Sequence, residues 1–215
     1  MFSSKIVSGF NGEINIPGDK SISHRSIIIP SISKGICEIS NILKSQDVMH
    51  TLNAFRLMGV KIEELKNKII IHGRGLNSLQ KPNREIQLGN SGTSARLLAG
   101  LLSAQKFNTT LLGDKSLSLR PMKRITDPLK LMNAKIETSN GCLPIKIYGR
   151  ELQNIEIRID IPSAQIKSGI ILAALNVKDK STIFETNITR NHTEIMLESF
   201  GANIDISKKN KEKNI

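Results

Sequence analysis

The residues best suited to chemistry lie where helices are predicted to begin. Between Ile14 and Arg25, an alternating apolar segment runs into Pro17-Gly18, and an apolar helix is predicted to follow. A helix N-terminus presents unpaired N–H groups and the positive end of the helix dipole, so it attracts anions. Lys20, Ser21 and Arg25 would add an ammonium group, a hydroxyl group and a bidentate guanidinium there. One such loop is typical of an ordinary capped helix with a solvated basic face, but this chain contains the pattern three times.

Each copy of the pattern is a short strand, a turn of small residues and then an apolar helix. The predicted strands are Glu13–Ile16, Glu85–Leu88 and Arg158–Ile161, and the predicted helices run from Ser21 to about Ser33, from Thr93 to Ala104 and from Ile166 to Leu175. The strands align at Ile16, Leu88 and Ile161, at spacings of 72 and 73 residues. Asp19 or Ser21 can cap the first helix. Spacings of this size indicate a repeated supersecondary unit.

The rest of the unit repeats as well. A second strand follows in each copy, at Ile36–Ile39, Thr109–Leu112 and Thr182–Phe184. An amphipathic helix comes next and is predicted to end at Gly59, Asn133 or Gly201, because Gly and Asn are the usual left-handed C-cap residues. Paired strands then close the first two copies, with Ile69–His72 and Ile145–Tyr148 as the last of them, whereas the third copy runs into a charged tail.

The unit is therefore β-α-β-α-β-β, present about two and three-quarter times. This pattern predicts an α/β fold with mixed sheets, in which three units pack around a pseudo-threefold axis with their helices at the centre. Residues 18–207 are predicted to form this domain, and residues 208–215 a frayed basic tail with little to bury. Lys5–Val7 is predicted to be a strand outside the repeat.

The composition restricts the classes of partner. With 31 Lys and Arg against 19 Asp and Glu among 215 residues, the net charge is +12, which suits nucleic acid, an anionic membrane or a small phosphorylated substrate. Lys accounts for most of the excess positive charge, and the chain is also rich in Asn and Ile. A composition bias of the whole genome is therefore an alternative explanation of the net charge. Aromatic residues make up only 3%, which leaves little material for stacking on bases.

Other features indicate the compartment. Cys37 and Cys142 are too few for a disulfide framework or a zinc site, and the histidines lack metal-ligand spacing. The N-terminal residues lack the apolar core of a signal peptide, and no apolar run reaches membrane-spanning length. We therefore expect a cytoplasmic protein with no metal, no nucleic acid and no membrane partner.

Pseudo-threefold packing would bring the three helix starts to one cavity. A second loop in each unit precedes the amphipathic helix, and in two units it carries an arginine, Arg120 or Arg190. Arg120 precedes Pro121, a favoured first helical residue, so its guanidinium would lie beside another positive helix end. Several cations and helix N-termini together fit ligands that carry several phosphate and carboxylate groups.

Five segments resemble the 5-enolpyruvylshikimate-3-phosphate synthase family. They are Pro17–Arg25, Leu88–Leu98, Leu119–Met122, Ser163–Ser168 and Arg190–Glu194. The resemblance covers essentially the whole chain. It implies transfer of the enolpyruvyl group of phosphoenolpyruvate to shikimate 3-phosphate in chorismate and aromatic amino acid biosynthesis, a step that glyphosate inhibits, without a cofactor. It also implies two domains of three units each, with the fold of an inside-out barrel. Residues 1–17 would then form a strand segment of the other domain.

The resemblance implies roles for individual residues. Lys20 should contact both substrates and be catalytic. The other expected shikimate 3-phosphate contacts are Ser21, Arg25, Ser163, Ala164, Gln165 and Arg190, and the other expected phosphoenolpyruvate contacts are Gly92, Arg120 and Gln165. Asp47, Asn90 and Thr93 are expected to position the loops.

Length is the main departure from the family. The family enzyme is about twice as long, and its second half supplies an acidic residue and a lysine for proton transfer. We therefore expect this chain to need that C-terminal half, with which it would form a monomeric enzyme, and to be inactive alone. Alternatives are a UDP-N-acetylglucosamine enolpyruvyl transferase, whose first loop normally has Asn where Ser21 stands, a basic RNA-end-binding module of related fold, and an inactive gene fragment.

Overall fold

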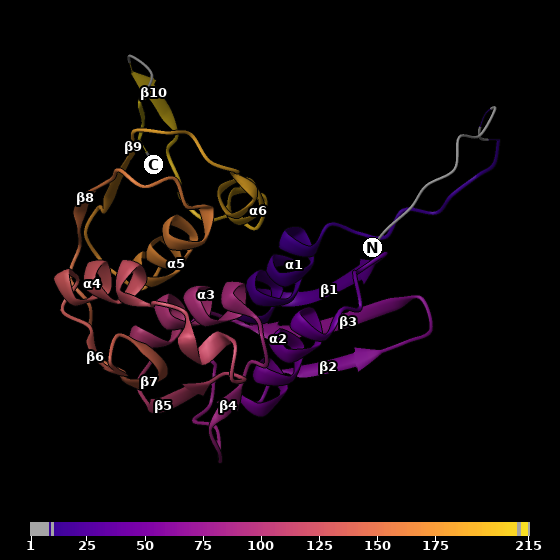
Figure 1. The fold of residues 1–215 in the computed structure, drawn as a ribbon, viewed down its shortest axis with the longest axis horizontal. Helices are drawn as coiled ribbons and strands as arrows, with labels where there is room; N and C mark the ends of the chain where they lie inside the picture. Colours follow the sequence, from indigo (N-terminus) through magenta and orange to yellow (C-terminus); the bar gives the residue numbers. More distant parts are fainter. Residues whose placement is uncertain (1–8, 10, 210–211, 215) are drawn as a thin grey trace, which may run out of the picture.

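Three β-sheets surround a central group of helices (Figure 1). The computed structural model describes residues 9, 11–209 and 212–214, and all structural statements here concern that part of the chain. Each sheet belongs to one sequence unit, and each mixes or reverses strand directions. The predicted α/β fold with mixed sheets and central helices is confirmed.

The second unit shows the repeat in full. Its elements are β4 (Ile86–Gln87), α3 (Gly92–Ser103), β5 (Asn108–Leu112), the short 3₁₀ helix η1 (Leu117–Leu119), α4 (Lys123–Leu131), β6 (Lys135–Ser139) and β7 (Cys142–Tyr148). The strand order is β4-β5-β7-β6, with β4 parallel to β5 and the other pairs antiparallel. The predicted β-α-β-α-β-β unit is therefore correct for this copy.

The third unit is also complete, which corrects the prediction of a frayed tail. Its elements are β8 (Glu156–Ile159), α5 (Ala164–Ala174), β9 (Thr182–Glu185), α6 (His192–Ser199), β10 (Ser207–Lys209) and β11 (Glu212–Asn214). The order β8-β9-β11-β10 matches that of the second unit. Pairing with the open edge of β9 satisfies backbone groups whatever the side chains are, so the charge run did not prevent strand formation.

The first unit lacks the predicted first strand. Its elements are α1 (Lys20–Ile32), β1 (Lys34–Ser40), α2 (Gln46–Leu57), β2 (Lys61–Glu64) and β3 (Lys68–Arg74), with sheet order β1-β3-β2. The predicted strand Glu13–Ile16 was wrong, because no described strand pairs with it, and Ile14 and Ile16 are 81% and 74% exposed. Alternation alone cannot make a strand without a neighbour. Lys5–Val7 lies outside the described residues.

Local signals set the start of α1 and the ends of three other helices as predicted, whereas α4 begins at Lys123 and not at Pro121. The carboxylate of Asp19 accepts a hydrogen bond from the Ile22 amide at 2.8 Å, so Asp19 rather than Ser21 caps α1. Gly59, Asn133 and Gly201 have φ values of +84°, +69° and +84°, which confirms the left-handed C-caps. These caps explain why three helices end at corresponding places in the repeat.

The core lies between the helices and the inner faces of the sheets. α3 and α5 approach so closely that a Cβ atom added to Gly100 would lie 1.8 Å from the Gly169 carbonyl oxygen.

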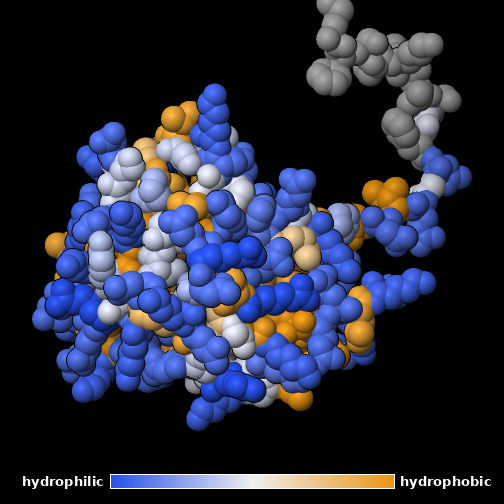
Figure 2. Space-filling model, turned by 90° about the horizontal axis from the view of Figure 1, so that it is seen from below, coloured by the Kyte–Doolittle hydropathy of each residue, from blue (hydrophilic) through white to orange (hydrophobic). Residues whose placement is uncertain are grey.

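The outer face in Figure 2 is mostly hydrophilic, with small apolar patches. Within the described residues, no helix combines the length and apolar character needed to cross a bilayer. The close packing of the helices brings their first turns together at one end of the domain.

Candidate anion-binding site

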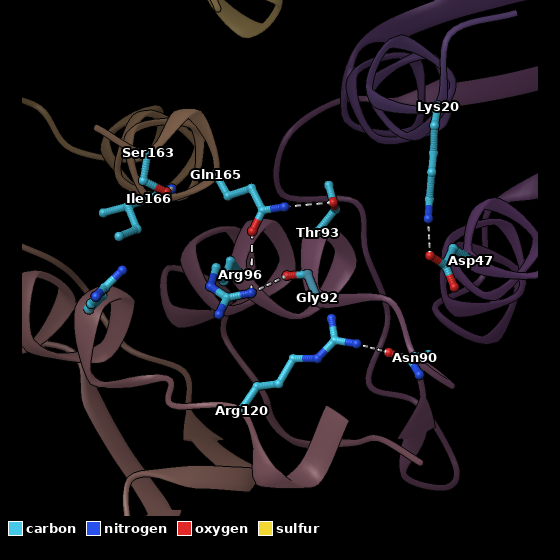
Figure 3. Close-up of a pocket in the computed structure, with 11 residues that line it drawn as sticks. Lys20, Asp47, Asn90, Gly92, Thr93, Arg96, Arg120, Ser163, Gln165 and Ile166 are labelled. Carbon is cyan, nitrogen blue, oxygen red and sulfur yellow. Dashed lines mark hydrogen bonds and ion pairs between the residues drawn. The ribbon is translucent and has the colours of Figure 1, made fainter. Parts of the chain in front are cut away.

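A cavity of about 350 Å³ lies where five helices begin. Residues in the first turns of α1 to α5, and in the loops before them, line it (Figure 3): Lys20, Asp47, Asn90, Gly92, Thr93, Arg96, Arg120, Arg124, Ser163, Gln165 and Ile166. Each helix start adds a partial positive charge, and the lining adds four cationic side chains against one carboxylate. The cavity is therefore suited to anions.

Lys20 and Asp47 form an ion pair on one side of the cavity (Figure 3). Their side chains are 51% and 21% exposed, so solvent screening limits what the pair contributes to stability. Its effect is on orientation, because it directs the Lys20 ammonium group across the start of α2.

Arg96 and Gln165 connect the starts of α3 and α5. Arg96 Nη1 donates to the Gly92 carbonyl oxygen at 3.0 Å and to Gln165 Oε1 at 3.2 Å. Gln165 Nε2 donates to Thr93 Oγ1 at 3.0 Å. Burial lowers the pKa of Arg96 first, and the charges of Arg120 and Arg124 lower it further, which indicates a crowded field of positive charge. An anion bound here would relieve that repulsion.

Arg120 and Gly92 form the floor of the same cavity. Arg120 Nη2 donates to Asn90 Oδ1, which holds the guanidinium beside the start of α3. Gly92 does not have a positive φ, so its role is one of space. A Cβ atom there would lie 2.8 Å from Arg96 Nη1 and 3.4 Å from Arg120 Nη1. The absence of a side chain therefore leaves room for both guanidinium groups.

The structure adds two cationic cavity residues for which no role was predicted from the sequence. Arg96 lies four residues after Gly92 on α3, and Arg124 lies four residues after Arg120. Residues four apart share one face of a helix, so this spacing was the signal that could have identified Arg96.

Ser21 and Arg25 lie in a second, buried polar cluster between α1, α5 and α6. Arg25 Nη1 donates to the Ser21 hydroxyl oxygen at 2.7 Å, Nη2 to Ser168 Oγ at 2.7 Å, and Nε to Thr193 Oγ1 at 2.5 Å. Burial lowers the pKa of Arg25 to about 10, and the Glu194 carboxylate opposes the shift. Arg25 therefore remains a cation with a fixed orientation.

Seven of the nine predicted site residues thus form two neighbouring groups. Five of them line the cavity: Lys20, Gly92, Arg120, Ser163 and Gln165. Ser163 caps α5, with its hydroxyl accepting from the Ile166 amide at 3.4 Å. Ser21 and Arg25 belong to the cluster between α1, α5 and α6. Ala164 is the first residue of α5 and does not line the cavity. Arg190 is an exposed loop residue whose charge lowers the pKa of Arg25.

Known proteins resemble the chain throughout. A profile described as EPSP synthase (3-phosphoshikimate 1-carboxyvinyltransferase) matches residues 5–215. The 3-phosphoshikimate 1-carboxyvinyltransferases of Oceanobacillus iheyensis and Ruthia magnifica are 48% and 49% identical over 93% and 96% of this chain, which covers 47% and 48% of their lengths. The solved EPSP synthase of Acinetobacter baumannii superposes with a TM-score of 0.88 at 44% identity, covering 95% of this chain and 46% of that one.

The match extends over almost all of the chain, including the segments that line the cavity, whereas the chain spans about half the length of the relatives that it matches. Sequence and fold agree on one relationship: the chain belongs to the EPSP synthase family.

Proposed function

We propose that this chain forms one half of the site that transfers the enolpyruvyl group from phosphoenolpyruvate to shikimate 3-phosphate, with release of phosphate. The observation that carries the proposal is the convergence of five helix starts and four cationic side chains on one cavity. Both substrates carry a phosphate and a carboxylate, so their summed negative charge matches this field. The names of the relatives favour this reaction over the alternatives.

The two groups of residues suggest how the substrates are shared between them. The cavity residues Lys20, Gly92, Arg120 and Gln165 would hold phosphoenolpyruvate. Shikimate 3-phosphate would lie between the cavity and the buried cluster, held by Lys20, Ser21, Arg25, Ser163, Ala164, Gln165 and Arg190. Lys20 is the one cation shared by both sets, which is why we assign it a catalytic contact with both anions.

The reaction needs an acid and a base as well as anion binding. A substrate hydroxyl gives up its proton and attacks the enol carbon while the methylene carbon is protonated. A proton is then removed from the resulting methyl group as phosphate leaves, which restores the C=C bond of the enolpyruvyl group. The one carboxylate among the described cavity residues is Asp47, and it is held by Lys20. We therefore assign electrostatic stabilisation to this chain, and propose that proton transfer uses groups from the part of the relatives that the chain does not cover.

We propose an organisation that follows from the same reasoning. Residues 18–207 form the three-unit domain, which the hairpin of β10 and β11 extends to residue 214. Residues 1–17 belong to the second domain of a monomeric, cytoplasmic enzyme. The extended path of residues 11–19, which joins no described sheet, supports this assignment.

The test is binding and turnover with the isolated chain. We expect shikimate 3-phosphate to bind in the millimolar range, about −4 kcal/mol, because the face is open to water. Lys20→Ala should abolish this binding, whereas Lys106→Ala, an exposed lysine beyond the far end of α3, should leave it unchanged. NMR titration measures both.

A phosphate-release assay with both substrates completes the test. We expect no turnover, because the described residues place no carboxylate at the cavity other than Asp47, which is paired with Lys20. Turnover by the purified chain would contradict the assignment of proton transfer elsewhere, and equal binding by wild type and Lys20→Ala would contradict the site itself. Steeply salt-dependent binding of generic RNA would favour the nucleic-acid alternative.

A further inference from the structure

Four charged side chains are buried together where α1, α5, β9 and α6 meet. Lys167 Nζ lies 2.9 Å from Glu185 Oε2 and 2.8 Å from Glu194 Oε1, and these three side chains are at most 2% exposed. Arg25 is 2% exposed, and its pKa responds to the charge of Glu194. Two positive and two negative charges thus share one buried region. Removing one member would leave a buried charge uncompensated, which is costly.

The cluster is connected to Arg25 through neighbouring residues in the sequence. Ser168 follows Lys167 on α5, and Thr193 precedes Glu194 on α6. The hydroxyl oxygens of Ser168 and Thr193 accept from Arg25 Nη2 and Nε at 2.7 and 2.5 Å, and they lie 2.7 Å from each other. In each pair, one residue belongs to the buried charge cluster and the other holds the guanidinium.

We propose that Lys167 is a positioning residue that fixes Arg25 for anion binding by holding Glu194 and the first turn of α6 against α5. A guanidinium held on three nitrogens does not need to be ordered when the ligand arrives, which favours affinity. The contacts named for Arg25, including the one from Nη1 to the Ser21 carbonyl at 2.9 Å, occupy four of its five N–H groups. The fifth, on Nη2, has no hydrogen-bond partner among the described residues, and the proposal assigns it to the anion.

The competing interpretation is that the cluster only joins α5 to α6. Overall stability cannot separate the two, because both interpretations predict that Lys167→Met destabilises the chain. The orientation of Arg25 can separate them. The Nε–H of a fixed arginine gives a resolved ¹H–¹⁵N signal that exchanges slowly with water, whereas a released side chain exchanges quickly. This signal does not require a substrate.

The experiment compares three variants of the full chain. Lys167→Met removes the cation, Glu194→Gln removes its partner's charge with little change of shape, and Thr126→Val is a matched control on a buried threonine of α4. In both cluster variants we expect exchange of the Arg25 Nε–H to accelerate at least about tenfold and shikimate 3-phosphate to bind about tenfold more weakly, on the scale of one charge-assisted hydrogen bond. The control should change neither.

The affinity readout rests on the proposed function, but the exchange readout does not. If wild type fails to bind shikimate 3-phosphate while the Arg25 signal still responds in both variants, the function fails and the positioning role stands. If exchange at Arg25 is unchanged in a folded Lys167→Met variant, the proposal is overturned. Should Lys167→Met fail to fold, the isosteric Glu194→Gln decides in the same way.

Discussion

Gly92→Ala should weaken phosphoenolpyruvate binding through displacement of a neighbouring arginine. The added methyl group would lie 2.8 Å from Arg96 Nη1, closer than carbon and nitrogen tolerate, so the guanidinium must move. That movement breaks its contacts with the Gly92 carbonyl at 3.0 Å and with Gln165 at 3.2 Å. The cavity then loses one oriented cation.

The magnitudes separate binding from folding. Losing one charge-assisted hydrogen bond to the ligand costs about 1.5–3 kcal/mol, which corresponds to roughly ten- to a hundredfold weaker binding. Stability should change by less than about 1 kcal/mol, because alanine is favoured over glycine in a helix and offsets the lost Arg96 contacts. Shikimate 3-phosphate, whose proposed contacts include neither Gly92 nor Arg96, should bind within about twofold of wild type.

A double-mutant cycle with Arg96→Ala tests this route. Calorimetric or NMR titration of phosphoenolpyruvate and of shikimate 3-phosphate is compared for both single variants and the double variant, together with thermal unfolding. If Gly92→Ala acts through Arg96, the double variant should bind no more weakly than Arg96→Ala. Additive losses would refute this reasoning and indicate that the methyl group meets the ligand directly. Equal weakening of both ligands with a lowered melting temperature would indicate damage to the fold.

Two further predictions concern stability. Gly100→Ala should lower the free energy of unfolding by more than about 3 kcal/mol in denaturant, because its Cβ would lie 1.8 Å from the Gly169 carbonyl oxygen. The control Gly12→Ala, whose Cβ would have no atom within 4 Å, should change the free energy of unfolding by less than about 0.5 kcal/mol. A mild effect at Gly100 would contradict the close approach of α3 and α5. Burial lowers the pKa of His24 from 6.5 to about 4; Asp47 opposes the shift, and Lys20 and Arg25 add to it. The unfolded chain therefore binds this proton more readily than the folded chain does. The free energy of unfolding should fall by up to about 3 kcal/mol as the pH is lowered from 6.5 to 4. His24→Gln should flatten this part of the profile, and an unchanged slope would assign the pH dependence to other groups.

The amino-acid sequence determined the features that depend on near neighbours. Asp19 caps α1 through an amide three residues away, and the left-handed C-caps at Gly59, Asn133 and Gly201 follow from the residue types themselves. The start of α1 and the C-caps of three helices, and hence most of the repeated unit, were therefore predictable, whereas α4 begins at Lys123 and not at Pro121. The family was recognisable for the same reason, because its motifs lie in these loops.

Tertiary structure decided the features that depend on partners far along the chain. Glu13–Ile16 has a strand-like pattern but joins no described sheet, while the charged segment after Ser207 forms strands because β9 offers an edge. Arg25 is held by Ser168 and Thr193, which are 143 and 168 residues away. A side chain's type tells what it can bind, but the packing of distant helices determines whether a charge is exposed at a cavity or buried beside its counter-charge.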